Sequence, residues 1–140
     1  MSGLGKTNGM RHVALYVVDL EKTESFYTEL LGMEVEWRPD TDNVYLTSGN
    51  DNLALHRRPE AQSDEGQRED DANESVLDHI GFFINEKERI SDWFTFLTDN
   101  GVKTLTEPRD HRDGARGFYC EDPSGTRVQL IYHPPIAKTD

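Results

Sequence analysis

One pattern occurs twice in this sequence. Residues 10–18 alternate between apolar and other side chains, as a half-buried strand does, and residues 78–84 repeat the alternation. The repeat places His79 at 67 positions after His12. A chain of 140 residues fits about one domain. We therefore expect a single domain over residues 10–134 that is built from two matched halves, residues 10–58 and 77–134.

An amphipathic helix is predicted after each repeat. Asp19 is a typical N-cap residue for the first helix, and Asn85 with Glu88 three positions later resembles a capping box for the second. Each helix is expected to end near a glycine, Gly32 or Gly101, because a left-handed residue commonly closes a helix.

Short extended segments follow each of these glycines. They cover residues 34–37, 44–47 and 53–57 in the first half, and 103–106, 116–121 and 127–133 in the second. Each half therefore reads β-α-β-β-β, which predicts an α+β fold of two βαβββ modules around an open cleft. The polar, acidic segment 59–76 has no periodicity and is the expected linker.

Successive side chains of a strand point to opposite faces, and this alternation decides which of them face away from the predicted helix. In the first strand the apolar set Val13, Leu15 and Val17 suits the helix side, so His12 and its alternating neighbours face the open side. The same rule places further polar side chains on the open face: His79, Gln129 and, by matching Pro59 with Pro134, His56. A single histidine on a strand is usually structural, but equivalent positions in both halves favour a shared role.

Charge and cysteine content exclude several classes of function. The chain has 27 acidic and 15 basic residues, a formal net charge of −12, which disfavours nucleic acid and anionic membrane as partners. Its one cysteine, Cys120, allows no internal disulfide. Because no membrane-spanning stretch and no secretory signal are evident, we expect a cytoplasmic protein.

Three segments carry a family resemblance. They are RHVALYVVDLEKTESFYTELLGMEV at 11–35, DHIGFFI at 78–84 and EDPSGTRVQLIY at 121–132. Together with the paired modules, they resemble the vicinal oxygen chelate superfamily, which is also called the glyoxalase/bleomycin-resistance/extradiol-dioxygenase superfamily. The resemblance covers residues 10–134. It indicates the fold strongly and the reaction weakly, since one fold serves several chemistries.

The resemblance implies a divalent metal held by His12, His79 and Gln129. Glutamate would be usual at the third position, so Gln129 is a departure from the family pattern. A fourth ligand found in glyoxalase-like members would fall on Ala54, which cannot bind a metal. Imidazole nitrogens and an amide oxygen suit Zn, Ni, Fe or Mn.

An amide in place of a carboxylate lowers metal affinity but leaves the bound ion its full charge. Such an ion favours an anionic, bidentate oxygen ligand: an enediolate, a catecholate or a carboxylate. A general base must also reach the reacting atom, and the sequence offers His56 and Glu121 as catalytic candidates. Tyr16 and Tyr45 are further hydrogen-bond donors.

Two functions of different class follow from the resemblance. The first is a metal-dependent enzyme, a lyase or isomerase or a dioxygenase, that acts on a small oxygen-rich substrate. The second is a metal-free protein that binds or sequesters a small molecule, as bleomycin-resistance proteins do. A fosfomycin-type thiol transferase is a third option, weakened by Gln129 because those relatives normally retain the glutamate. The resemblance also implies a homodimer, with each cleft formed within one chain or between two.

Overall fold

The computed structural model describes residues 4, 8–59 and 77–135. The chain forms two compact units, residues 1–63 and 64–140, and each is described by itself. The division falls inside the acidic segment 59–76, of which only Pro59 belongs to the described residues. The expected linker therefore lies almost entirely outside them.

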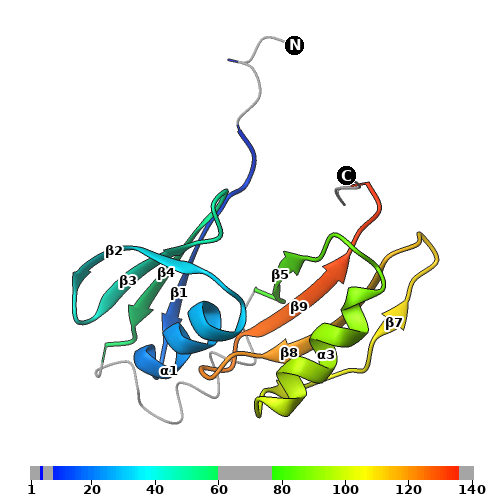
Figure 1. Ribbon diagram of the computed structural model, residues 1–140. Coiled ribbons are helices and arrows are strands. Elements are labelled where there is room, and N and C mark those ends of the chain that lie inside the picture. Colours follow the sequence, from blue (N-terminus) through cyan, green and yellow to red (C-terminus); the bar gives the residue numbers. More distant parts are fainter. Residues whose placement is uncertain (1–3, 5–7, 60–76, 136–140) are drawn as a thin grey trace. The chain divides into compact units, whose positions relative to one another are not determined.

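The first unit is a four-stranded sheet with one helical segment (Figure 1). Its elements are β1 (His12–Val17), α1 (Leu20–Ser25), the π-helical segment η1 (Phe26–Leu30), β2 (Glu34–Asp40), β3 (Asn43–Thr47) and β4 (Asn52–Arg57). The strand order is β1-β4-β3-β2. Strands β1 and β4 run parallel, and the other pairs are antiparallel.

The helix of this unit begins and ends where the sequence predicts. The Asp19 carboxylate accepts a hydrogen bond from the Lys22 backbone N–H at 3.0 Å, which satisfies a first-turn donor. Gly32 closes the segment with a φ of 81°. The last turn is wider than an α-helix, because the Leu31 N–H donates to the Phe26 carbonyl five residues earlier.

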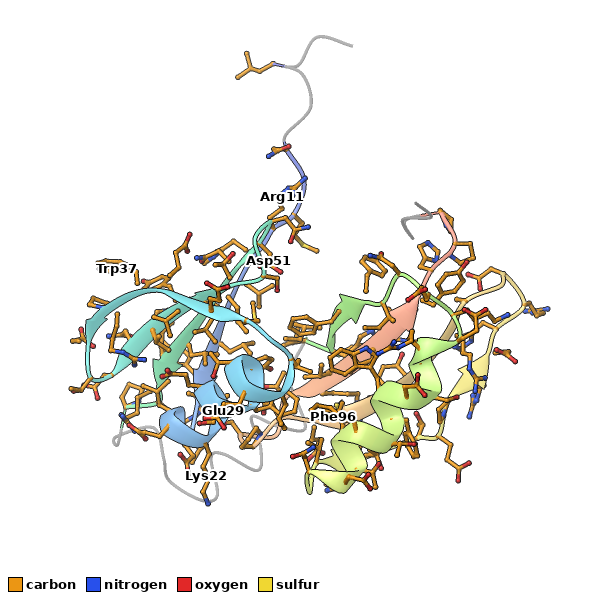
Figure 2. The ribbon with its side chains drawn as sticks, viewed as in Figure 1. Arg11, Lys22, Glu29, Trp37, Asp51 and Phe96 are labelled. Carbon is orange, nitrogen blue, oxygen red and sulfur yellow. The ribbon has the colours of Figure 1, made fainter. Side chains whose placement is uncertain are left out.

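The predicted alternation of β1 is confirmed. Leu15 and Val17 are buried, whereas His12, Ala14 and Tyr16 are exposed on the other face. The remaining core of this unit comes from the helical segments, the turn after them and the two central strands: Leu20, Phe26, Tyr27, Met33, Val44, Leu46, Leu53, Ala54 and Leu55. Trp37 projects from β2, the edge strand farthest from β1, and is 58% exposed (Figure 2).

The second unit repeats the plan. Its elements are β5 (Ile80–Phe83), α3 (Arg89–Asp99), β6 (Lys103–Thr104), β7 (Arg109–Asp110), β8 (Arg116–Glu121) and β9 (Arg127–Tyr132). The order is β5-β9-β8-β6, with β7 also paired to β8. Strand β5 runs parallel to β9, which lies beside it in Figure 1. Helix α3 buries Ile90 and Leu97, and β8 and β9 contribute Phe118, Val128 and Leu130 to the core.

Two predictions for this unit are wrong in detail. Helix α3 begins at Arg89, and the position before it, Glu88, makes no side-chain cap. The N-cap position is thus Glu88 and not the predicted Asn85, and a turn closed by the Arg89 N–H on the Glu86 carbonyl at 3.0 Å immediately precedes the helix. The strand predicted over 103–106 ends at Thr104, and the short strand β7 follows it.

No helix among the described residues is long and apolar enough to cross a membrane.

Candidate metal and substrate site

The second sheet presents Gln129 on the face opposite the one on which α3 packs. Gln129 lies on β9, directly opposite Gly81 on β5 and Tyr119 on β8. Its side chain is largely buried, with the residue 9% exposed. A Cβ added at Gly81 would lie 3.9 Å from Gln129 Oε1. Because glycine has no Cβ, the space beside the amide oxygen stays open.

His79 lies on the same face, immediately before β5. Alternation places it with Gly81, and its ring packs edge-on against Tyr119, with 5.0 Å between the centroids. Its Nδ1 donates a hydrogen bond of 2.7 Å to Asp78 Oδ1, which leaves Nε2 as the second ring nitrogen for another ligand. The hydrogen bond to His79 is the main cause that lowers the pKa of Asp78. The second sheet thus brings His79 and Gln129 together.

Glu121 lies on this face as well, two residues along β8 from Tyr119 and opposite Arg127. Lys103 Nζ is 3.6 Å from its carboxylate, whose side chain is 30% exposed. Arg127 lies 3.7 Å from Asp78, beside His79. The predicted base therefore stands near the His79–Gln129 pair in a setting with two cationic side chains.

His12 lies at the corresponding place in the first sheet, at the start of β1 and opposite Asn52. Its Nδ1 is 2.7 Å from Asn52 Oδ1, and Asn52 Nδ2 donates to Glu36 Oε1 at 2.5 Å. Glu36 occupies a bulge in β2, where the pairing with β3 shifts between Val35 and Trp37. As in His79, the ring nitrogen that remains for a further ligand is Nε2.

His56 lies on the same face of the first sheet as His12, but at the opposite end of the strands. It lies opposite Tyr16, four positions along β1 from His12, which corresponds to about 13 Å along the strands. Two nitrogens bound to one ion at about 2.1 Å each cannot span that separation without large side-chain displacement. His56 Nδ1 is also held, at 2.6 Å, by Asn43 Oδ1.

Aromatic rings surround His56. The centroids of Tyr16 and Tyr45 lie 6.2 Å and 6.0 Å from its ring, and Trp37 stacks on Tyr45 at 5.1 Å. Tyr16 and Trp37 are more than half exposed, at 59% and 58%. This aromatic cluster, defined as Tyr16, Trp37, Tyr45 and His56, offers stacking surface that extends from the His56 end of the strands to their middle, where Tyr45 pairs with Ala54.

Sequence reasoning missed three of the residues at these positions. Tyr119 could have been found, because it alternates with Glu121 on a predicted strand that pairs with that of Gln129. Asn52 and Asn43 could not, because their contacts to histidine depend on strand register. Ala54, the position of the missing fourth ligand, is buried in β4 and offers no donor atom.

The predicted ligands offer two imidazole nitrogens and one amide oxygen. Donors of these types suit a divalent ion such as Zn, Ni, Fe or Mn. Within the described residues no three His, Cys, Asp or Glu side chains gather as a metal site. The predicted set has only two residues of those types, because its third member is Gln129. His12 belongs to the first unit, and His79 and Gln129 belong to the second. That all three share one ion stays a prediction.

Comparison with known proteins bears on the family. The model of the Glyoxalase/Bleomycin resistance protein/Dioxygenase superfamily matches residues 9–130. The chain is 29% identical over 122 residues to the metallothiol transferase FosB of Staphylococcus saprophyticus, covering 86% of this chain and 74% of that protein. It is 30% identical to a trivalent organoarsenical cleaving enzyme of Bacillus sp. (strain MD1), covering 89% and 79%.

A solved structure shows the same fold. Lactoylglutathione lyase from Agrobacterium tumefaciens matches with a TM-score of 0.73 and 20% identity, covering 96% of this chain and 100% of that one. The family match spans most of the 140 residues and both sheets. The chain therefore belongs to the glyoxalase/bleomycin resistance protein/dioxygenase superfamily.

Proposed function

We propose that this protein is a divalent-metal-dependent enzyme that acts on a small, oxygen-rich anionic substrate. The observation that carries the proposal is the matched placement of two histidines: His12 is the first residue of β1, and His79 immediately precedes the equivalent strand β5. Each has its Nδ1 engaged by an oxygen of the chain, so each offers Nε2. Gln129 Oε1, beside the side-chain-free Gly81, supplies the oxygen donor.

In this proposal, His12 Nε2, His79 Nε2 and Gln129 Oε1 hold the ion. A bound Zn, Ni, Fe or Mn ion would polarise substrate oxygens and stabilise the negative charge that develops on them. Since the three protein ligands are neutral, an anionic substrate compensates the charge of the ion better than a neutral one. This supports enediolates, catecholates, carboxylates and chemically similar anions as substrates.

The surrounding residues of the second sheet suit such a substrate. Glu121 is the proposed general base, because its carboxylate lies one pleat from Tyr119 on the face that carries Gln129. Lys103 lies 3.6 Å from that carboxylate, and Arg127, which pairs with Glu121 in register and lies 3.7 Å from Asp78, adds a second positive charge; both can hold an anionic group. Tyr119, whose ring is against His79, can donate a hydrogen bond to a substrate oxygen.

His56 has a different place in the proposal. Its distance along the sheet from His12 suits contact with a part of the substrate remote from the ion, where its Nε2 can accept a proton or a hydrogen bond. The aromatic cluster around it would pack against the same part.

The names of the relatives favour group transfer as the reaction type. Two are called metallothiol transferase and glutathione transferase, and a third is called an organoarsenical cleaving enzyme. We therefore place transfer of a thiol first, with lyase, isomerase and dioxygenase chemistry as alternatives. The thiol would come from a second substrate, because Cys120 is fully buried in the core.

Metal binding tests the proposal directly. Protein purified without chelator is analysed for metal, then stripped and titrated calorimetrically with Zn, Ni, Mn and Fe(II). We expect one bound ion per protein chain, and we expect His12→Ala and His79→Ala each to abolish binding. His111→Ala is the matched control, because His111 lies in a different segment, beyond β7. Wild-type protein that binds none of these ions would overturn the proposal.

The second candidate function is metal-free binding of a small molecule. It is favoured by the exposed ring of Trp37, stacked on the half-buried Tyr45, which resembles a binding surface for a planar ligand. Quenching of tryptophan fluorescence by metal-free bleomycin, lost in Trp37→Leu and independent of His79, would support this function over the enzyme.

A further inference from the structure

We propose that two asparagines, each held by a carboxylate of β2, are positioning residues that keep His12 and His56 protonated at Nδ1. The first relay is Glu36–Asn52–His12, and the second is Asp40–Asn43–His56. Both lie in the first unit. The effect of the first relay on metal binding rests on the proposed function, whereas the tautomers do not.

The direction of the first relay follows from which atoms can donate. The Glu36 carboxylate can only accept, so the Asn52 amide must turn its NH₂ group toward it, as the 2.5 Å contact has it. Asn52 Oδ1 then faces His12, and an amide oxygen is an acceptor only. The 2.7 Å contact therefore requires a proton on His12 Nδ1 and leaves the lone pair of the neutral ring on Nε2.

The second relay has the same polarity. Asn43 Nδ2 donates to Asp40 Oδ1 at 2.8 Å, and Asn43 Oδ1 faces His56 Nδ1 at 2.6 Å. The Asp40 carboxylate is fixed by the turn itself, because it also accepts the backbone N–H of Asp42 at 2.8 Å. Strand register supplies both contacts, since Asn52 pairs with His12 and Asn43 with His56.

The two relays prepare the two ends of one sheet face for different tasks. At the His12 end, an oriented Nε2 is the atom that binds the ion. At the His56 end, about 13 Å away along the strands, Nε2 accepts a proton or hydrogen bond within the aromatic cluster. A histidine whose other nitrogen is hydrogen-bonded is held in one ring orientation, and loss of such a partner typically weakens metal binding 10-fold to 100-fold.

Nitrogen NMR of the metal-free full chain tests the tautomers. The protein is labelled with ¹⁵N-histidine, and long-range ¹H–¹⁵N spectra at mildly alkaline pH identify the protonated nitrogen of each ring. We expect His12 and His56 to be protonated at Nδ1. Glu36→Gln lets the first amide turn either way, so His12 should become a mixture while His56 does not change. Asp40→Asn should do the reverse.

The same pair of variants separates positioning from folding. Glu36→Gln should weaken binding of Zn or Mn about tenfold, whereas Asp40→Asn should leave it unchanged. Asn52→Ala should repeat the effect of Glu36→Gln, and thermal unfolding monitors the fold of each variant. Protonation of His12 or His56 at Nε2 in the wild type would overturn the relays even if the protein binds metal. Absence of metal binding with both tautomers as expected would overturn only the proposed function.

Discussion

Gln129 faces Gly81 across the parallel β5–β9 pair, and a Cβ added at that glycine would come 3.9 Å from the amide oxygen. The distance is ordinary van der Waals contact, so backbone packing does not require glycine at position 81. The absence of a side chain there instead leaves room beside Gln129 Oε1. A second glycine of this sheet, Gly117, is different, because an added Cβ would lie 2.6 Å from the Leu130 carbonyl oxygen.

Substitution should therefore cost much more stability at Gly117 than at Gly81. Gly117→Ala forces the backbone of β8 away from β9 and should destabilise the protein by about 1–3 kcal/mol. Gly81→Ala should change stability by less than about 1 kcal/mol. Gly81→Val should fold equally well but weaken metal binding about tenfold, because its methyl groups occupy the space beside Gln129. Urea unfolding and metal titration measure these effects. Equal stability losses at both positions would contradict the packing argument.

Gln129→Glu tests the departure from the family pattern. A carboxylate at this position adds a charge–charge attraction to the ion, so affinity for Zn or Mn should rise by about tenfold or more. Without metal, burial of the new charge should lower the melting temperature, since Gln129 is only 9% exposed. Calorimetric titration and thermal unfolding with and without metal check both effects. A higher melting temperature of the metal-free variant would contradict the prediction.

Much of the fold could be predicted because its signals are local. The alternation in β1, the cap at Asp19 and the glycines that close both helices each depend on a few adjacent residues, and the structure confirms them. The start of α3 could not be predicted in the same way. Asn85 and Glu88 have the spacing of a capping box, but a turn closed by the backbone of Arg89 precedes the helix.

The site could be predicted only in part, for a different physical reason. Face alternation placed His79 and Gln129 on one side of the second sheet, and the structure has them there. The partners of the histidines depend on register between strands, which no local pattern encodes. Register also separates His56 from His12, although both were expected on the same open face.

Asp40 gives a prediction for acid stability. The Asp42 backbone N–H, followed by the Asn43 amide, holds the pKa of Asp40 below its ordinary value of 3.8. The ionised carboxylate therefore contributes stability that is fully present above that value and is lost as pH falls through the lowered pKa. Asp40→Asn should be less stable than the wild type near neutral pH, and the difference should vanish in acid. Urea unfolding of both proteins, from neutral pH down to below the pKa of Asp40, measures this difference in stability. A difference that persists in acid would contradict the assignment.

Cys120 should be unreactive in the folded protein. Burial, together with the charges of Asp122 and Glu121, raises the pKa of its thiol to about 12. At about pH 8 the thiolate is then on the order of one part in ten thousand, and it lies fully inside the core. Ellman's reagent should therefore react with the native protein only through unfolding, and at once in guanidinium chloride. Rapid reaction of the native protein would contradict this.

Slow reaction means that any thiol-transfer activity draws its sulfur from a second substrate, so turnover should depend on added thiol and should survive in Cys120→Ala.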